Sequence, residues 1–244
     1  MAAAAPGRHN GWMYTLHIGN KNYSSWSLRP WALMSELGIP FEEVNHVFGA
    51  GFLRSIAGKS PTNRVPVLHH EGRQVWDSLA ILEYLADRHA GVWPTDATAR
   101  AWARCAAAEM HSGFQALRND CGMSCGVRVK LHRVSDALAK DVARISQLWT
   151  EGLDRFGGPF LAGRELGGVD AFFCPVAFRV QSYGLELSEP AAGYARRLLA
   201  APSMKRWYEA ALAEPWRDAD HDAEIAQSGR IVQDLRAAAK VAAA

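Results

Sequence analysis

The first sixty residues alternate between strand-like and helix-like hydrophobic patterns. Residues 13–18 (MYTLHI) and 41–48 (FEEVNHVF) are short and rich in strand-forming side chains. Between them, residues 27–37 (SLRPWALMSEL) carry apolar side chains at helical spacing, and Gly38 ends that run. We therefore expect a strand, a helix and a strand, followed by a glycine-rich irregular segment at residues 49–60.

The next thirty residues predict two more strands and a helix. Residues 64–70 (RVPVLHH) and 73–76 (RQVW) have strand composition. A helix is expected to open at Asp77-Ser78 and to end near residues 89–91. Its apolar stripe consists of Leu79, Leu82, Leu85 and Ala86. The order of elements up to this point is βαβ–ββα.

From residue 95 onward the apolar positions recur at helical spacing, and we expect no further strand. We predict an α/β plus all-α protein with a bundle of about five helices. The predicted divisions are a disordered tail at residues 1–12, an α/β domain at 13–91 and a helical domain at 95–235.

Composition and charge narrow the class of protein. Of 244 residues, 49% are hydrophobic and 21% charged, which is ordinary for a soluble globular protein. Lys and Arg are scattered and the formal net charge is only +2, which argues against nucleic acid or acidic membranes as partners. No apolar run approaches the ~18 residues needed to cross a bilayer. The opening residues lack the pattern of a signal peptide, so we expect a cytoplasmic location.

The four cysteines are too sparse for a disulfide framework. Cys121 and Cys125 lie four residues apart in CGMSCG, where a zinc or redox pair and two reduced thiols are both conceivable, and reduced thiols are favoured. His69 and His70 are adjacent in an expected strand and would point to opposite faces. We predict no metal site.

Three short motifs carry candidate chemistry. Pro66 interrupts a strand; it is either an edge-strand proline or the bend of a cis turn that leaves the Val65 backbone free to pair with an extended ligand. Asp77-Ser78 is either a helix cap or a site for the charged end of an amino acid. The serines of NYSSWSLR (residues 22–29) are either caps or hydroxyls that stabilise a thiolate at a helix N-terminus.

In combination, these motifs resemble the glutathione transferase family over about residues 13–220. The stretch SSWSLR (24–29) is most similar to the SSCxxR motif of zeta-class enzymes and related bacterial transferases. The resemblance implies a thioredoxin-like N-terminal domain, an α-helical C-terminal domain, reduced glutathione as co-substrate, a homodimer, and a role in detoxification.

The resemblance assigns Ser24 as the thiol-activating hydroxyl. Ser25 would be its neighbour in the glutathione site, and Arg29 would lie one helical turn on. Trp26 stands where the zeta motif has Cys. A thiol-disulfide oxidoreductase of the glutaredoxin or omega type needs that cysteine, which argues against this alternative.

The remaining glutathione contacts are assigned in the same way. Val65, before Pro66, would pair with the cysteinyl backbone, and Asp77 and Ser78 would hold the γ-glutamyl end. Lys59 is a candidate for the glycyl carboxylate. Asp77 replaces the Glu or Gln usual in the family and is one methylene shorter.

A second departure from the family pattern lies in GRELGGVD. Gly167 replaces the family's helix-capping Ser or Thr, with Asp170 kept three residues later. Because Gly at an N-cap costs only a few tenths of a kcal/mol, we expect this helix to form.

The implied reaction is attack of the glutathione thiolate on a small hydrophobic electrophile bound between the domains. The candidate wall residues, which have core packing as their alternative role, are His111, Phe114, Arg118 and Met123. A non-catalytic binding protein of the same fold would show the same motifs.

Maleylacetoacetate isomerase is a further alternative. By resemblance, zeta-class enzymes place an Arg twelve residues after the capping Asp, and that position here is Ser182. The nearest guanidinium belongs to Arg179, which would serve only if it reached back into the cleft. We therefore expect poor isomerase activity and a preference for neutral electrophiles.

Overall fold

The computed structural model describes residues 13–237. The tail expected at residues 1–12 lies outside the described residues.

The first half of the chain forms a four-stranded mixed sheet in the order β2-β1-β3-β4. Strand β1 (Tyr14–Gly19) pairs in parallel with β2 (Phe41–His46) and antiparallel with β3 (Val67–His70), which pairs antiparallel with β4 (Arg73–Val75). All four expected strands are present, and their parallel and antiparallel pairings match the βαβ–ββα order.

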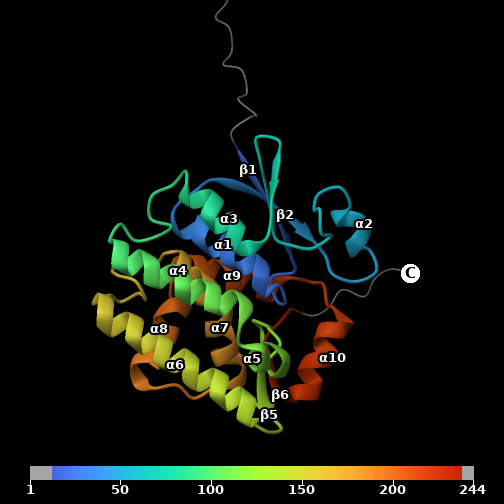
Figure 1. The fold of residues 1–244 in the computed structure, drawn as a ribbon. Coiled ribbons are helices and arrows are strands. Elements are labelled where there is room, and N and C mark those ends of the chain that lie inside the picture. Colours follow the sequence, from blue (N-terminus) through green and yellow to red (C-terminus); the bar gives the residue numbers. More distant parts are fainter. Residues whose placement is uncertain (1–12, 238–244) are drawn as a thin grey trace, which may run out of the picture.

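Two helices lie between this sheet and the second half of the chain (Figure 1). Helix α1 (Ser25–Glu36) packs against α3 (Ser78–Ala86) and against two helices of the second half. Its residues Leu28, Leu33 and Met34 are fully buried. Burial on nearly every side explains why α1 carries apolar residues around most of its circumference.

The sequence predicted an irregular segment at residues 49–60, but the structure has a short helix there. Phe52–Ile56 form the short helix α2. Only Ile56 of this helix is fully buried, and a five-residue helix gives too little periodicity to stand out among three glycines and a lysine.

The second half contains seven helices within the described residues, two more than expected. Their bounds are α4 Ala97–Ser112, α5 Gln115–Asp120, α6 Asp136–Phe156, α7 Gly168–Tyr183, α8 Glu189–Leu199, α9 Pro202–Ala213 and α10 Ala219–Ser228. Helix α7 is buried almost along its full length and contacts α1, α4 and α8. The predicted domain boundary at residues 91–95 lies between α3 and α4.

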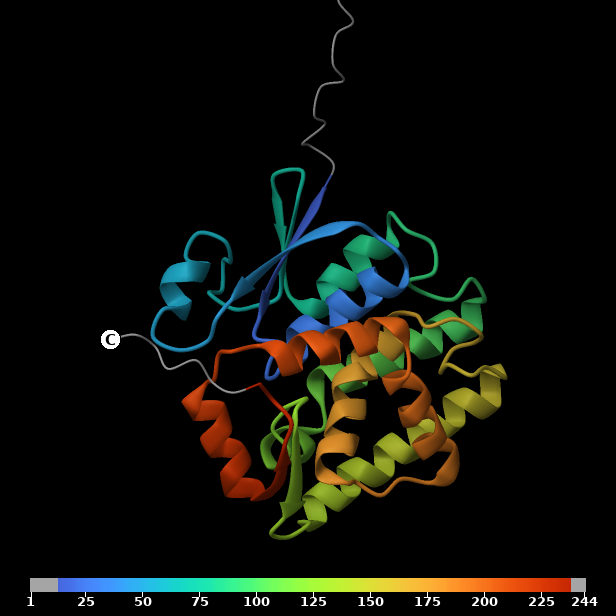
Figure 2. The same cartoon turned by 180° about the vertical axis from the view of Figure 1, so that it is seen from behind.

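The prediction that no strand follows residue 95 was wrong. Strands β5 (Val127–Leu131) and β6 (Gly229–Asp234) form an antiparallel pair. They join segments about a hundred residues apart and lie side by side in both views (Figure 2). The alternation Val127, Val129, Leu131 is the strand signal, but it is short and its partner is distant.

Helix α7 begins where expected, with Gly167 as its N-cap. The Asp170 carboxylate accepts hydrogen bonds from Gly167 N (2.9 Å), Leu161 N (3.0 Å) and the Tyr194 hydroxyl (2.8 Å). The carboxylate therefore ties the start of α7 to the preceding loop and to α8. No helix in the described part of the chain is long and apolar enough to cross a membrane.

Candidate functional site

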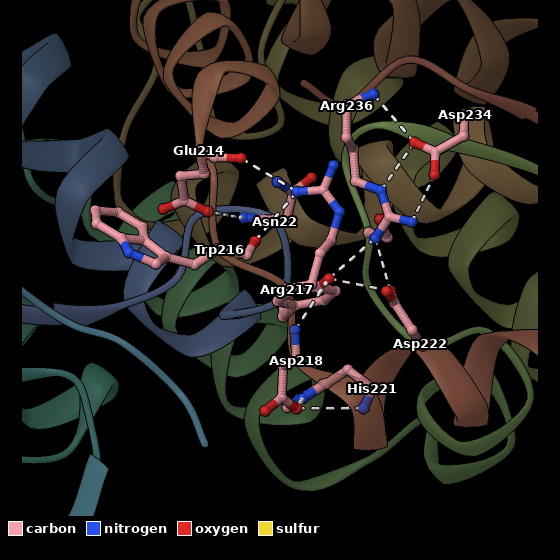
Figure 3. Close-up of polar contacts among 12 residues, drawn as sticks. Asn22, Glu214, Trp216, Arg217, Asp218, His221, Asp222, Asp234 and Arg236 are labelled. Carbon is pink, nitrogen blue, oxygen red and sulfur yellow. Dashed lines mark hydrogen bonds and ion pairs between the residues drawn. The ribbon is translucent and has the colours of Figure 1, made fainter. Parts of the chain in front are cut away.

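The loop between β1 and α1 carries the candidate serine and is held by the helical half of the chain. Trp207 Nε1 of α9 donates to the Lys21 carbonyl at 2.9 Å, and the Asn22 side-chain amide donates to the Ala211 carbonyl at 2.5 Å. The Glu214 carboxylate accepts from the Lys21 and Asn22 backbone amides at 2.8 and 3.3 Å (Figure 3). These contacts from the helical half hold the loop that leads into Ser24.

Ser24 is the N-cap residue of α1, but its side chain makes no capping hydrogen bond. Its hydroxyl donates instead to Ser27 Oγ at 2.7 Å, and Ser27 Oγ also accepts from Gly19 N at 3.1 Å. Since Ser27 has a hydroxyl proton of its own, rotation of both hydroxyls would let Ser27 donate to Ser24 and free the Ser24 proton for a ligand. The simple capping alternative is therefore not realised by this side chain.

Ser24 borders a cavity of about 540 Å³. Five of the predicted site residues line it, namely Ser24, Ser25, Val65, Arg118 and Met123. The other lining residues are Tyr23, Trp26, Phe48, Phe52, Arg64, Gly122, Arg179, His221 and Glu224. The lining side chains come from both halves of the chain, and two guanidinium-bearing helices, α5 and α7, contribute to it.

The Val65-Pro66 peptide bond is cis. The Val65 N–H and C=O make no hydrogen bond to another described residue, so they remain available to an extended ligand in the cavity.

Asp77 and Ser78 are not among the residues that line the cavity. Asp77 caps α3 by accepting from Leu79 N at 3.1 Å, and its carboxylate also lies 3.3 Å from His111 Nε2 of α4. The Ser78 hydroxyl is buried and accepts from Arg29 at 3.5 Å. The Asp77 side chain is 55% exposed, so it can still meet a ligand's ammonium group.

Arg29 is fully buried, and its guanidinium lies over the rings of Trp26 (4.1 Å) and Phe172 (4.5 Å). Burial lowers the pKa of Arg29 well below its usual value, and the nearby Arg118 and Arg179 lower it further. The side chain connects Trp26 and Ser78 without bordering the cavity. Its position is that of a support for the site.

Lys59, His111 and Phe114 do not line the cavity. Lys59 is exposed after α2, and its carbonyl accepts from His69 Nε2 at 2.6 Å. The His111 ring packs edge-on against Trp26, and burial lowers its pKa although Asp77 acts in the opposite direction. Phe114 is buried in the core.

Part of the chain matches a known family model. Residues 23–88 match the model of the glutathione S-transferase N-terminal domain. This matched segment contains Ser24, Val65 and Asp77.

Three solved structures extend the likeness beyond this domain. A glutathione transferase homologue from Burkholderia with bound glutathione is 23% identical, with a TM-score of 0.62 over 82% of this chain and 98% of its own. A diazinon-metabolizing glutathione S-transferase from the silkworm, Bombyx mori, is 21% identical, with a TM-score of 0.65 over 82% and 96%. A rice glutathione S-transferase in complex with glutathione is 26% identical, with a TM-score of 0.55 over 79% and 90%.

The chain therefore has the glutathione S-transferase fold, with a thioredoxin-like sheet followed by a helical domain. The fold expected from the sequence is confirmed.

Three arginines line the cavity, namely Arg64, Arg118 and Arg179, and the sequence placed Arg179 outside it. Arg179 is 5% exposed and donates to the Cys121 carbonyl at 2.8 Å, while Arg118 donates to the Gly113 carbonyl at 3.0 Å. Neither forms an ion pair with a carboxylate in residues 13–237. Burial lowers the pKa of Arg179 to about 10, which leaves it charged at neutral pH.

The two cysteines of CGMSCG are buried free thiols. Burial raises the pKa of Cys121 to about 12 and raises that of Cys125 as well. Cys125 Sγ donates to the Lys21 carbonyl at 3.4 Å. Thiols with raised pKa values are poor nucleophiles and metal ligands, and the Cys125 side chain instead supports the loop before Ser24. Within residues 13–237, no cluster of three or more His, Cys, Asp or Glu side chains is arranged to hold a metal ion.

Sequence reasoning missed the contribution of the C-terminal segment to the cavity. His221 and Glu224 of α10 line it, and α10 lies about two hundred residues after Ser24. The only local signal was the polar sequence RDADHDAE between two apolar segments, which has no distinctive motif.

Proposed function

We propose that this protein is a glutathione transferase that promotes attack of the glutathione thiolate on a small electrophile. The observation that carries the proposal is the meeting of the Ser24 hydroxyl and the unpaired Val65 backbone at one cavity, within the segment that matches the glutathione S-transferase N-terminal domain. These groups supply a thiolate donor and a peptide-binding edge, which are the two features a bound cysteinyl residue requires.

In the proposed complex, Val65 and Pro66 hold the cysteinyl backbone while Asp77 and Ser78 hold the γ-glutamyl end. Ser25 and Arg29 support the same end of α1, and Lys59 is kept as a candidate for the glycyl carboxylate. The Ser24 hydroxyl donates to the sulfur, and Ser27 donates to Ser24 in turn. Lowering a thiol pKa from ~8.5 by two requires ~2.7 kcal/mol, which one charge-assisted hydrogen bond and a helix N-terminus supply.

Turnover and binding need separate tests, since a non-catalytic binding protein would share the site. We expect purified protein to bind reduced glutathione in calorimetry and to conjugate it to chlorodinitrobenzene. Binding without turnover of any electrophile in a panel would favour the non-catalytic alternative. Absence of binding would contradict the proposal itself.

The residues that line the cavity bear on the choice of electrophile. Met123 and Phe52 give the cavity an apolar wall that suits the neutral electrophiles expected from the sequence. Isomerisation of maleylacetoacetate is a second candidate, favoured by one observation: Arg179 does border the cavity and has no carboxylate partner among the described residues. Ser182 at the zeta-class position donates instead to the Ser124 carbonyl at 2.7 Å.

A side-by-side assay separates these candidates. Purified protein is given glutathione with maleylacetone or with neutral aryl and alkyl halides, and Arg179→Ala is compared in each. Fast isomerisation that Arg179→Ala abolishes would favour the isomerase. Halide conjugation that survives the substitution would favour the transferase. Assembly as a homodimer and a cytoplasmic, detoxifying role are further proposals, the first of which light scattering would test.

A further inference from the structure

Helix α10 is fastened to the residue that precedes the catalytic serine. The Arg236 side chain is 4% exposed, and its guanidinium lies 2.6 Å from Asp222 and 2.7 Å from Asp234 (Figure 3). It also donates to the Tyr23 hydroxyl at 2.9 Å, and that hydroxyl donates to Asp222 at 3.0 Å. These charge-assisted bonds to a buried guanidinium fix α10 against Tyr23, the neighbour of Ser24.

His221, in the first turn of α10, has a fixed ring. Its Nδ1 lies 2.5 Å from Asp218 Oδ2, and the Asp218 side chain is 9% exposed. The imidazole stacks on Tyr23, with centroids 5.1 Å apart, and on Phe48, with centroids 5.3 Å apart. Three partners therefore hold the imidazole. Asp218 already caps α10 by accepting a hydrogen bond from His221 N, so its contact with the ring and the two stacked rings go beyond a capping role.

The other ring nitrogen is free. His221 lines the cavity together with Ser24 and Val65, and Nε2 makes no hydrogen bond with any residue in the described range. A carboxylate on Nδ1 fixes the tautomer, so Nε2 is the atom that can exchange a proton with a molecule in the cavity.

We propose that His221 and Asp218 form the acid–base dyad of this cavity, and that the dyad suits electrophiles that are α,β-unsaturated carbonyl compounds. The proposal rests on the proposed function, since glutathione supplies the thiol. His221 Nε2 is the catalytic group, and Asp218 is a positioning residue that acts through it.

The step balances with one circulating proton. Nε2 takes the proton of the glutathione thiol, and the Asp218 carboxylate offsets the charge of the imidazolium. The thiolate forms a C–S bond at the β carbon while the π electrons of the C=C bond move to the carbonyl oxygen as an enolate. Nε2–H then protonates the α carbon, which regenerates the neutral ring and releases the adduct. No other reactant is needed.

The charges around the cavity suit this sequence. Asp218, Asp222 and Glu224 of the α10 segment carry negative charges, which favour the imidazolium. Arg236 carries a positive charge but is paired with Asp222 and Asp234. The facing elements contribute the guanidiniums of Arg64, Arg118 and Arg179, together with Tyr23. Since Arg118 and Arg179 have no carboxylate partners within residues 13–237, they are available to the enolate oxygen, the only anion that forms late in the step.

The experiment compares two electrophiles, because only one of them needs the proton back. Cinnamaldehyde is a conjugate-addition acceptor, whereas chlorodinitrobenzene loses chloride and returns no proton to carbon. The variants are His221→Phe, which keeps an aromatic ring for stacking, His221→Ala, and Asp218→Asn. The matched control is Asp220→Asn, which removes a carboxylate from an exposed position of the same helical turn.

We expect His221→Phe to lower kcat with cinnamaldehyde by 10²-fold or more, the usual size of a general acid–base contribution. Its kcat with chlorodinitrobenzene should fall by about tenfold, since Ser24 still stabilises the thiolate. Added imidazole should restore part of the cinnamaldehyde turnover of His221→Ala. Asp218→Asn should lower kcat with little change in KM, and Asp220→Asn should match the wild type.

Equal losses with both electrophiles, without rescue by imidazole, would overturn the dyad and leave His221 a structural role. An unchanged rate in His221→Phe would do the same. If the wild-type protein binds glutathione but turns over neither electrophile, the proposed transferase function is wrong. The dyad, which rests on that function, is then wrong as well. Circular dichroism and thermal unfolding of each variant identify any that fails to fold.

Discussion

Single hydroxyl groups decide how this site treats a thiol. Ser24 is a donor whose proton is held by Ser27 at 2.7 Å, and Ser27 in turn accepts from Gly19 N. These hydrogen bonds hold the Ser24 oxygen in place before a ligand arrives, and each bond in such a chain polarises the next. Rotation of the two hydroxyl protons is then enough for Ser24 to donate to a thiolate while Ser27 donates to Ser24.

Removing this donor should act on the thiol and leave the fold intact. We expect Ser24→Ala to raise the pKa of the bound glutathione thiol by about 1 to 2, from the size of one charge-assisted hydrogen bond. Turnover at pH 7 should fall in proportion to the lost thiolate. The thiolate absorbance of the enzyme–glutathione complex, titrated against pH, measures this directly.

Ser25→Ala is the matched control, because Ser25 borders the same cavity one residue further on. Full activity in Ser24→Ala together with loss in Ser25→Ala would show that the assignment within the motif is wrong by one residue. Ser27→Ala should produce a smaller change in the same direction as Ser24→Ala.

Asp77 acts on a different quantity. Its carboxylate caps α3 and lies beside His111. We expect Asp77→Asn, which keeps a capping oxygen, mainly to raise KM for glutathione. The reason is that the amino-acid end of the ligand is bound alike in the ground and transition states. A loss confined to kcat in steady-state kinetics would contradict this role.

At this scale the sequence could indicate Ser24 and Val65 because each sits in a local motif, a serine before a helix and a proline within a strand. It could not indicate His221 or Asp218. Their use depends on the return of α10 to Tyr23, and that return is made by Arg236 and Asp222 at a distance in the chain. The sequence identifies Arg179 as the nearest guanidinium, but spacing along a helix alone does not give the direction of its side chain.

At the scale of elements, the β1–α1 loop is held chiefly by residues at the end of α9. The Glu214 carboxylate accepts from two backbone amides of the loop and from the Asn45 side chain of β2, at 3.3 Å in the last case. Burial raises the pKa of Glu214, and its hydrogen bonds act against that rise. The glutathione site is thus built on a contact between the two halves of the chain.

We expect Glu214→Ala to lower both stability and turnover. Two buried amides of the loop would lose their acceptor, which costs about 1 to 3 kcal/mol for each unsatisfied group. Thermal unfolding should show a lower Tm, and kcat should fall because Ser24 loses its fixed position. Glu209→Ala, at an exposed position of the same helix, should change neither. A reduced Tm with normal kcat would show that the loop is positioned by Trp207 and Asn22 alone.

The sequence predicted the elements whose buried side chains recur with a single period, either that of a helix or that of a strand. The strands of the sheet and helices such as α1 and α6 bury a continuous face, so their patterns are clear. Helix α2 buries one residue, and β5 and β6 are stable only as a pair. A pairing between segments a hundred residues apart leaves no mark on either segment beyond a short alternation.

Across the whole molecule, a second group of contacts bears on stability rather than on the site. Three histidines from neighbouring strands gather on one face of the sheet. His17 of β1 hydrogen-bonds His46 of β2 at 2.9 Å and lies 4.4 Å, centroid to centroid, from His69 of β3. His46 also contacts Ser55 of α2 at 3.0 Å. Burial, together with the neighbouring His69 and His46 rings and Lys59, lowers the pKa of His17 to about 4.

This cluster makes stability depend on pH, and the sign follows from the depressed pKa. An unfolded histidine titrates near 6.5. Between pH 6.5 and about 4 the unfolded chain therefore binds a proton at His17 that the folded chain does not, so stability is complete above this window and is lost as pH falls through it. Asp170 acts in the opposite sense, because burial raises its pKa to about 6 and folding then favours its protonation.

Comparison with a variant isolates the histidine contribution from that of Asp170. We expect the wild type to lose about 2 to 3 kcal/mol between pH 7 and pH 4 relative to His17→Gln, at ~1.4 kcal/mol for each unit of pKa difference. Gln can still hydrogen-bond His46 but does not titrate. Urea unfolding at closely spaced pH values measures the difference, and His132→Gln, at an exposed position, is the matched control. If His17→Gln and His132→Gln follow the same pH dependence as the wild type, the buried cluster is not what limits stability in acid.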